Sequence, residues 1–290
     1  MMKIMEDARV LSQEKVAFQT HLLRLSAGRI SREARLGQFL MLQVRDGTDP
    51  LLRRPFSFHR IDGEQGIIEI LYRVVGRGTW CLSRCERGDH VGIIGPLGNG
   101  FQLPECDPAP VVAVAGGIGI APMLQLLEKL AQWMGLEGRK RGIHLFYGVR
   151  TAEEFIPETA LDTLGITVHW STDDGTKGHE GFVTRLLEDT TRREKIKPCA
   201  VYSCGPLAMQ YHVAKWALEN AVPSQLSLES LMACGIGACL GCALPAVNRA
   251  APQEDHYLHV CKDGPVFKAE MIQWHKIQTH PANPPIFLYS

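Results

Sequence analysis

VAGGIGIAPM, residues 114–123, decides the fold of the middle of this chain. The overlapping stretch VVAVAGG predicts a buried strand that runs into glycines, and APMLQLLEKLAQWMG after it has helical periodicity. Gly116, Gly117 and Gly119 allow a tight turn and let a diphosphate approach the helix N-terminus, where free N–H groups favour anions. Pro122 suits the first helical turn. Because the pattern is GGxGxxP and not GxGxxG, loop packing remains an alternative to a dinucleotide site.

A second loop of the same kind lies in VYSCGPLAM, residues 201–209, where Cys204, Gly205 and Pro206 follow a strand and precede a helix. HLFYGVR and ITVHWSTDD predict strands between the two loops, separated by helical stretches. Alternating strands and helices predict a parallel sheet, and two loops at its carboxyl edge would share a crevice. We therefore expect an α/β dinucleotide-binding domain over residues 104–222.

The first part of the chain, residues 1–103, is rich in short β-type runs separated by turns such as Asp46-Gly47 and Asp62-Gly63. Several short strands at regular spacing predict a small antiparallel β-barrel. Two stretches within it stand out, RPFSF at residues 54–58 and YRVVGRGTW at residues 72–80. The second stretch predicts a short helix from Thr79 to Cys85.

Four cysteines mark the C-terminal part, residues 223–290, in the spacing C-x4-C-x2-C followed by a distant fourth cysteine. This is the plant-type [2Fe–2S] spacing, and glycines within ACGIGACLGC permit the sharp bends that three converging thiolates need. A structural zinc site is the alternative, although zinc ribbons usually present two C-x2–4-C knuckles. The predicted cluster ligands are Cys234, Cys239, Cys242 and Cys261. The proline-rich tail from Thr279 is expected to be extended.

Composition indicates a globular chain of two to three domains, with 290 residues, 45% hydrophobic residues and no net charge. The zero net charge gives no indication that the chain binds nucleic acid or an anionic membrane surface. No stretch is apolar for long enough to span a bilayer, and no secretory signal is visible. Nine cysteines without such a signal favour a reducing, cytoplasmic location with thiols kept for metal. The cysteines outside the ligand pattern are expected to be small buried residues: Cys81, Cys85, Cys106 and Cys199.

Residues 10–222 resemble the ferredoxin–NADP reductase superfamily, in which a flavin barrel precedes a nicotinamide domain. The resemblance implies that Arg54 pairs with the FAD pyrophosphate, that Ser57 bonds near flavin N5, and that the short helix holds phosphate oxygens at its N-terminus. Phe56 stands where the family usually has tyrosine. We expect His59, beside this motif, to be a surface residue of an edge strand. The FAD-binding residues implied are Arg54, Pro55, Phe56, Ser57, Tyr72, Arg73, Gly76, Gly78 and Thr79.

The same resemblance assigns the pyrophosphate of the nicotinamide cofactor to the first glycine loop and the nicotinamide ring to the Cys-Gly-Pro loop. NADP-specific members place basic residues after a middle strand, where this chain has STDDGTKG. Carboxylates there would repel a 2′-phosphate, so NAD is expected, while nearby Lys177 leaves NADP open. Ser57 and Cys204 are the catalytic candidates. The nicotinamide-site residues implied are Gly116, Gly117, Gly119, Ala121, Pro122, Asp173, Asp174, Cys204, Gly205 and Pro206.

The whole chain resembles the electron-transfer subunits of class 1B dihydroorotate dehydrogenases, through the flavin motifs, the glycine loop and the cysteine segment. The resemblance implies a relay of NAD(H), FAD and [2Fe–2S] to an FMN-containing catalytic subunit that converts dihydroorotate to orotate in pyrimidine biosynthesis. It also implies a 2:2 heterotetramer. No Ser-His-Asp set or carboxylate pair for an organic substrate is visible, which fits a partner that holds the substrate.

Two other functions remain open at this point. The chain could be the small subunit of an NADH-dependent ferredoxin:NADP or sulfide reductase complex, which uses the same three modules. It could also be a regulatory binding protein that uses the cluster as a redox switch and turns over nothing. The identity of the partner distinguishes the ferredoxin or sulfide reductase subunit from the dihydroorotate dehydrogenase subunit. NADH-driven reduction of the flavin distinguishes an electron-transfer subunit from a regulatory binding protein.

Overall fold

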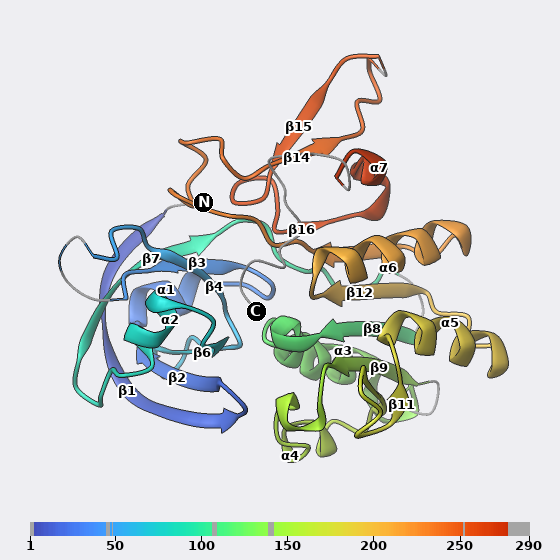
Figure 1. Ribbon diagram of the computed structural model, residues 1–290, viewed down its shortest axis with the longest axis horizontal. Coiled ribbons are helices and arrows are strands. Elements are labelled where there is room, and N and C mark those ends of the chain that lie inside the picture. The colour runs from blue at the N-terminus through green and yellow to red at the C-terminus, as the bar shows by residue number, and fades with distance from the viewer. Residues whose placement is uncertain are drawn as a thin grey trace.

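The computed structural model describes residues 3–44, 47, 49–105, 109–138, 142–251 and 253–277. The proline-rich tail, Cys106 and part of the expected turn at residues 46–47 lie outside the described residues. Three units are visible in Figure 1: a curled sheet in blue and teal, a second sheet with helices in green and yellow, and an orange-red C-terminal unit. The C-terminal unit lies across the other two.

The first sheet has seven antiparallel strands in the order β4-β3-β7-β1-β2-β6-β5. Strand β4 also contacts β6, so the sheet curls into a half-barrel around a core of aliphatic side chains. The predicted antiparallel barrel is thus confirmed. Its elements are β1 (Ile4–Ala17), β2 (Thr20–Ser26), α1 (Gly28–Glu33), β3 (Phe39–Leu42), β4 (Arg54–Ser57), β5 (Arg60–Asp62), β6 (Ile67–Arg73), α2 (Arg77–Leu82) and β7 (His90–Leu97).

Helix α2 begins earlier and ends earlier than the sequence predicts. The Thr79 hydroxyl accepts hydrogen bonds from the N–H groups of Val75 (3.0 Å) and Gly76 (3.2 Å), which would otherwise lack partners at a helix start. Thr79 is therefore the third residue of the helix and not its first. The turn that contains Cys85 follows the helix.

The second sheet has the order β11-β10-β9-β8-β12-β13-β16 and is parallel except for β16. Strand β8 is buried on both faces, as the continuous apolar run predicts. Val111, Ala113 and Ala115 pack with helix α3, whereas Val112 and Val114 pack with α5 and α6. The elements are β8 (Val111–Gly116), η1 (Gly117–Ile120), α3 (Met123–Gly138), β9 (Ile143–Val149), η3 (Ala152–Glu154), α4 (Thr159–Asp162), β10 (Thr167–Thr172), β11 (His179–Glu180), α5 (Val183–Arg193), β12 (Ala200–Cys204), α6 (Leu207–Glu219) and β13 (Ser224–Ser227).

The C-terminal unit is a small hairpin with short helical turns that shares its core with both larger units. Its elements are β14 (Ala243–Ala246), β15 (His256–His259), β16 (Val266–Phe267), η4 (Ala269–Met271) and α7 (Trp274–Ile277). Strands β13 and β16 both lie beyond the predicted boundary at residue 222, yet they pair with each other in the second sheet. Among the described residues, no helix combines the length and apolar character needed to cross a membrane.

Candidate functional site

The two predicted nicotinamide loops meet at the carboxyl edge of the second sheet. Strands β8 and β12 are neighbours, so the glycine loop and the Cys-Gly-Pro loop leave the sheet side by side. A Cβ atom at Gly119 would overlap the carbonyl oxygen of Cys204 and would lie 2.7 Å from the nitrogen of Gly205. A Cβ atom at Gly116 would lie 2.8 Å from Cδ of Pro206. The glycines are therefore required by this close approach. The two loops share one edge of the sheet, and the crevice expected between them stays a prediction.

Cys204 is buried within this edge, with 2% of its surface exposed. Burial is the main cause that raises the pKa of its thiol, with a smaller effect of nearby Glu229. The thiol is therefore neutral at physiological pH and can contact a nicotinamide ring without acting as a thiolate nucleophile.

No sequence pattern pointed to Glu229, which precedes the cysteine segment. Its side chain reaches solvent, yet surrounding protein desolvates the carboxyl and raises its pKa. Its charge also acts on the thiol of Cys204, so Glu229 is a further candidate for this site.

The loop after β10 holds the two carboxylates that the sequence assigns to nicotinamide specificity. The carboxylate of Asp174 accepts hydrogen bonds from the hydroxyl (2.6 Å) and N–H (3.1 Å) of Thr176, which lower its pKa. Burial raises the pKa of Asp173, and Arg150 opposes that rise. Lys177, which left NADP open, lies over the rings of Trp170 (4.1 Å) and Phe155 (5.2 Å) and pairs with Glu158. Its charge is thus already partnered, which weakens the case for a 2′-phosphate site.

The two predicted flavin motifs come together where β4 meets the start of α2. A Cβ atom at Gly78 would lie 2.7 Å from Nε of Arg54, so the glycine makes room for the guanidinium. The Arg54 guanidinium also donates to the carbonyl of Leu52. An arginine beside the first turn of a helix suits a pyrophosphate, because both offer N–H donors to anionic oxygens.

Tyr72 and Phe56 pack with each other inside the barrel. Their rings meet edge to face at 5.6 Å, and the Tyr72 hydroxyl donates to Oε1 of Gln13 (3.1 Å). Tyr72 is 2% exposed. Tyr72 thus packs against Phe56 of the flavin motif from the core of the barrel. The assignment of Tyr72 as an FAD-binding residue stays a prediction.

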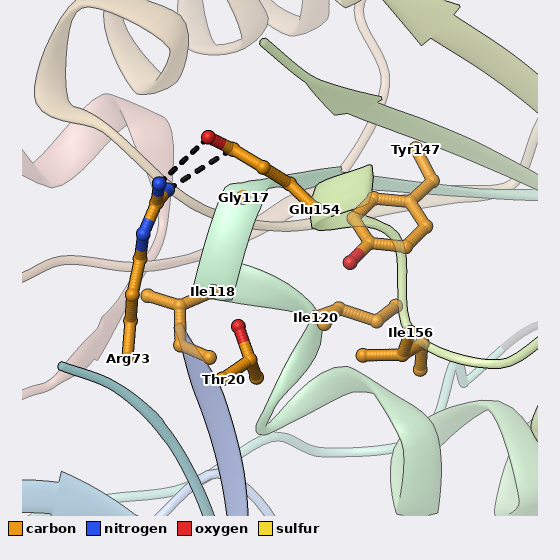
Figure 2. Close-up of a pocket in the computed structure, with 8 residues that line it drawn as sticks. All are labelled: Thr20, Arg73, Gly117, Ile118, Ile120, Tyr147, Glu154 and Ile156. Atoms are coloured by element: carbon orange, nitrogen blue, oxygen red, sulfur yellow. Dashed lines mark hydrogen bonds and ion pairs between the residues drawn. The ribbon is translucent and has the colours of Figure 1, made fainter. Parts of the chain in front are cut away.

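Arg73 joins the barrel to the nicotinamide domain. Its guanidinium makes a bidentate ion pair with Glu154, at 2.6 and 3.0 Å, and Arg150 adds a third contact to the same carboxylate (3.3 Å). Figure 2 shows this pair beside Gly117 and Ile118, at a cavity of about 10 Å³ that is roughly the room for one water molecule. The predicted role of Arg73 toward FAD therefore competes with a strong contact between domains.

His59 is buried, which corrects the expectation that it is a surface residue. It is 5% exposed, and its Nδ1 lies 2.8 Å from the carbonyl oxygen of Ala121 in the glycine loop. Nδ1 therefore carries the donated proton. Burial lowers the pKa of the imidazole to about 4, so the ring is neutral at physiological pH. The strand position suggested an exposed edge, but helix α3 covers that edge through Gln125. The Gln125 side chain accepts a hydrogen bond from the N–H of Ile61 (3.1 Å) and donates one to the carbonyl of Ile61 (2.9 Å).

The four predicted cluster ligands form two pairs in the C-terminal unit. Sγ atoms of Cys242 and Cys261 lie 3.2 Å apart and are buried. The Cys239 N–H donates to Sγ of Cys234 (3.4 Å), and the Cys239 side chain also bonds to that sulfur. Two pairs of thiols match a binuclear group in which each iron takes two. Within the described parts of the chain, no three His, Cys, Asp or Glu side chains are arranged around a single metal ion.

The cluster loop also offers backbone donors to sulfur. Burial opposes ionisation of Cys234, but N–H groups of Ile236 and Cys239 outweigh it and lower the pKa to about 6. Burial and the neighbouring Cys242 raise the pKa of Cys261 to about 12. Gly235 and Gly237 have positive φ, +68° and +84°, which turns their backbone toward the sulfurs. The donor set therefore fits an iron–sulfur cluster, whose thiolates and sulfides accept such bonds.

Barrel residues hold this loop from two sides. The ammonium of Lys3 donates to the carbonyl of Ile236 (2.8 Å). The side-chain amide of Asn99 donates to the carbonyls of Lys262 (3.3 Å) and Asp263 (3.0 Å), in the turn after Cys261. The cluster segment is thus fixed to the flavin unit by polar contacts at both of its ends.

The cysteines outside the ligand set were expected to be buried, but Cys81, Cys85 and Cys199 are only partly buried. Burial raises the pKa of Cys85, as it does for an inert structural thiol.

Three family models match consecutive parts of the chain. The oxidoreductase FAD-binding domain matches residues 7–101, the oxidoreductase NAD-binding domain matches residues 113–215, and the iron-sulfur cluster binding domain of dihydroorotate dehydrogenase B matches residues 229–273. Fold and site together define an oxidoreductase that binds a flavin, a nicotinamide cofactor and an iron–sulfur cluster.

Similar curated proteins show which family of oxidoreductases the chain belongs to. A protein of Desulforamulus reducens is 36% identical over 269 residues, covering 92% of this chain and 98% of its own. One of Geobacillus kaustophilus is 39% identical over 269 residues, covering 91% and 96%. Both are named dihydroorotate dehydrogenase B (NAD(+)), electron transfer subunit. The chain belongs to this family of electron transfer subunits.

Solved structures share the fold. The structure of an NADH-dependent reduced ferredoxin-NADP oxidoreductase, described for flavin-based electron bifurcation, superposes with a TM-score of 0.79 at 25% identity, covering 96% of this chain and 93% of that one. The ferredoxin reductase of carbazole 1,9a-dioxygenase superposes with a TM-score of 0.65 at 18% identity, covering 77% and 68%. The second likeness concerns the fold alone.

Proposed function

We propose that this chain carries electrons between NAD and an FMN-containing catalytic subunit that converts dihydroorotate to orotate. FAD, when bound, exchanges a hydride with the nicotinamide and single electrons with the [2Fe–2S] cluster. The observation that carries the proposal is the placement of the thiol pairs, which lie in a unit fixed to the flavin barrel. The glycine loop meets the same barrel through His59, and Glu154 of the nicotinamide domain pairs with Arg73 of the barrel.

The chain's own residues have distinct roles in this proposal. Arg54 and the first turn of α2, with Gly76, Gly78 and Thr79, hold the FAD pyrophosphate. Strand β4 passes the flavin with Pro55 and Ser57 on one face and Phe56 on the other, packed against Tyr72. The glycine loop holds the nicotinamide pyrophosphate at the N-terminus of α3. Cys204 stays a neutral thiol beside the nicotinamide ring, so it packs and orients without competing as a nucleophile.

The cluster loop supports an interface with the catalytic subunit. Cys239 is exposed, and three large apolar side chains of the same segment are also exposed: Leu231 (68%), Ile236 (37%) and Leu240 (58%). Apolar side chains gathered on a surface are typical of a protein interface. We infer that the partner covers this loop, in a 2:2 complex located in the cytoplasm.

A second candidate has one observation in its favour. The NADH-dependent ferredoxin-NADP oxidoreductase structure matches nearly the whole of both chains at 25% identity. The small subunit of a related complex would use the same FAD, NAD and cluster sites with a different flavoprotein partner. Relatives at 36–39% identity carry the dihydroorotate name, which favours the first candidate.

The test is to coexpress the chain with each candidate partner from its own genome and to purify the complex anaerobically. We expect an FMN dehydrogenase to copurify in equal amounts and to support dihydroorotate-driven reduction of NAD. Copurification with a large ferredoxin-linked flavoprotein, and no dihydroorotate activity, would contradict the proposal and favour the second candidate.

A further inference from the structure

Strand β3 has two faces that belong to different cores. Leu40 and Leu42 point into the half-barrel, where they pack in its aliphatic core. Phe39 and Met41 point the other way, into a core that also contains the cluster ligands Cys242 and Cys261. One short strand thus separates the interior of the flavin unit from the cluster unit.

The outward face of β3 continues into the flavin motif. In the antiparallel pair of β3 and β4, Met41 lies opposite Pro55, and Phe39 lies opposite Ser57. Directly opposed residues of an antiparallel pair project from the same face of the sheet. The side chains of Pro55 and Ser57 therefore share a face with Met41.

Met41 also contacts the cluster loop. A Cβ atom at Gly235 would overlap Cγ of Met41 and would lie 2.6 Å from its Sδ. Gly235 adjoins the ligand Cys234 and has a φ of +68°, so any other residue would be both strained and obstructed. Met41 is fully buried in this position. Its thioether therefore occupies the space between the flavin-motif strands and the backbone of the cluster loop.

We propose that Met41 is a positioning residue that sets the distance between FAD and the [2Fe–2S] cluster. It seats the loop that begins at Cys234 against the strand paired with the flavin motif, and Gly235 is the gap into which it fits. This inference rests on the proposed relay of electrons through both groups. It assigns to Met41 no contact with substrate and no proton or electron of its own.

The test uses the full chain loaded with FAD and cluster, and variants Met41→Ala, Met41→Leu and Leu226→Ala. Leu226 is fully buried in the same core, and the three atoms nearest a Cβ at Gly235 all belong to Met41, so Leu226→Ala controls for a cavity elsewhere in that core. The direct readout is the dipolar coupling between half-reduced FAD and the reduced cluster, measured by pulsed EPR. Stopped-flow spectroscopy then separates FAD reduction by NADH from electron arrival at the cluster.

We expect Met41→Ala to broaden and lengthen the distance distribution and to slow transfer to the cluster severalfold, with FAD reduction by NADH unchanged. Met41→Leu, which conserves volume, and the Leu226→Ala control should keep the wild-type distance. A wild-type distance distribution in Met41→Ala would overturn the inference and leave the relay standing. Absence of any transfer in the loaded wild-type chain would instead overturn the relay, and the inference with it.

A second measurement concerns the fit between the two residues. Gly235→Ala alone should lose most of its cluster iron, because the new Cβ meets Met41. In the double variant with Met41→Ala the obstruction is gone, so iron content should recover most of the loss, with only the strain of positive φ remaining. No recovery would overturn the inference. If Met41→Ala does not fold, Met41→Val replaces it in both experiments.

Discussion

Arg73 and Glu154 form a bidentate ion pair that joins the flavin barrel to the nicotinamide domain, with both side chains mostly buried (16% and 8% exposed). The pair lies beside the glycine loop at Gly117 (Figure 2). The Glu154 carboxylate also pairs with Arg150, so three N–H donors from two domains converge on it. We infer that this pair aligns the nicotinamide loop with the flavin site.

Glu154→Gln should lower the free energy of unfolding by about 2 kcal/mol, because the mostly buried guanidinium of Arg73 loses its counter-charge and the more exposed Arg150 loses a contact with the same group. Urea unfolding of the loaded protein measures this change. Glu194→Gln breaks an exposed pair with Arg193 and is the control, expected to cost under about 0.5 kcal/mol. Equal effects of the two variants would contradict the role of Glu154.

His59 should make stability depend on pH in the acid range. Its pKa is about 4 in the folded protein and 6.5 when exposed, so the unfolded chain binds a proton that the folded protein does not. Stability is therefore complete above pH 6.5 and falls toward pH 4, by about 3 kcal/mol from this residue. His59→Asn should remove that part of the slope, whereas His256→Asn, at an exposed position, should keep it. Unfolding curves at several pH values measure the slope, and identical slopes for wild type and His59→Asn would refute the assignment.

Gly119→Ala should weaken NADH binding. The added methyl would overlap the Cys204 carbonyl, a backbone atom that cannot move aside easily, and overpacking of this kind costs about 2 kcal/mol. A cost of that size corresponds to a loss of at least about tenfold in affinity. Isothermal titration with NADH measures it. Gly28→Ala, where a Cβ meets nothing within 4 Å, is the control and should bind normally.

Replacing both carboxylates after β10, as Asp173→Ser with Asp174→Arg, should raise the preference for NADPH. The change removes two negative charges and adds a guanidinium where the 2′-phosphate is expected, and a gain of 1.4 kcal/mol would be about tenfold. The ratio of kcat/KM for NADPH and NADH measures it. Asp189→Ser, on helix α5, is the control. An unchanged ratio in the double variant would rule out this loop as the specificity site.

Local sequence patterns correctly predicted those parts of the site whose structure depends on residues close together in the chain. The strand, glycine turn and helix around Gly117 follow from apolar runs and turn residues, and the cysteine spacing identifies the ligand set. The start of α2 was misplaced by two residues because the Thr79 hydroxyl caps it from inside the first turn.

The contacts between domains could not be read from the sequence, because they join residues more than 60 positions apart. Nothing near Arg73 indicates that its partner is Glu154, and nothing near His59 indicates that the carbonyl of Ala121 covers it. Likewise, the need for glycine at position 235 depends on Met41, which lies on a strand of the first domain. Such pairs are decided by how the three units pack.

The central claim is that electrons reach the partner through the cluster, and Cys242→Ser tests it most directly. Cys242 is buried against Cys261, so serine removes a ligand with little change in volume. In the complex with the proposed FMN subunit, we expect this variant to lose dihydroorotate-driven reduction of NAD while NADH still bleaches its FAD. Cys81→Ser, outside the ligand set, should retain both reactions. Full coupled activity in Cys242→Ser would contradict the relay.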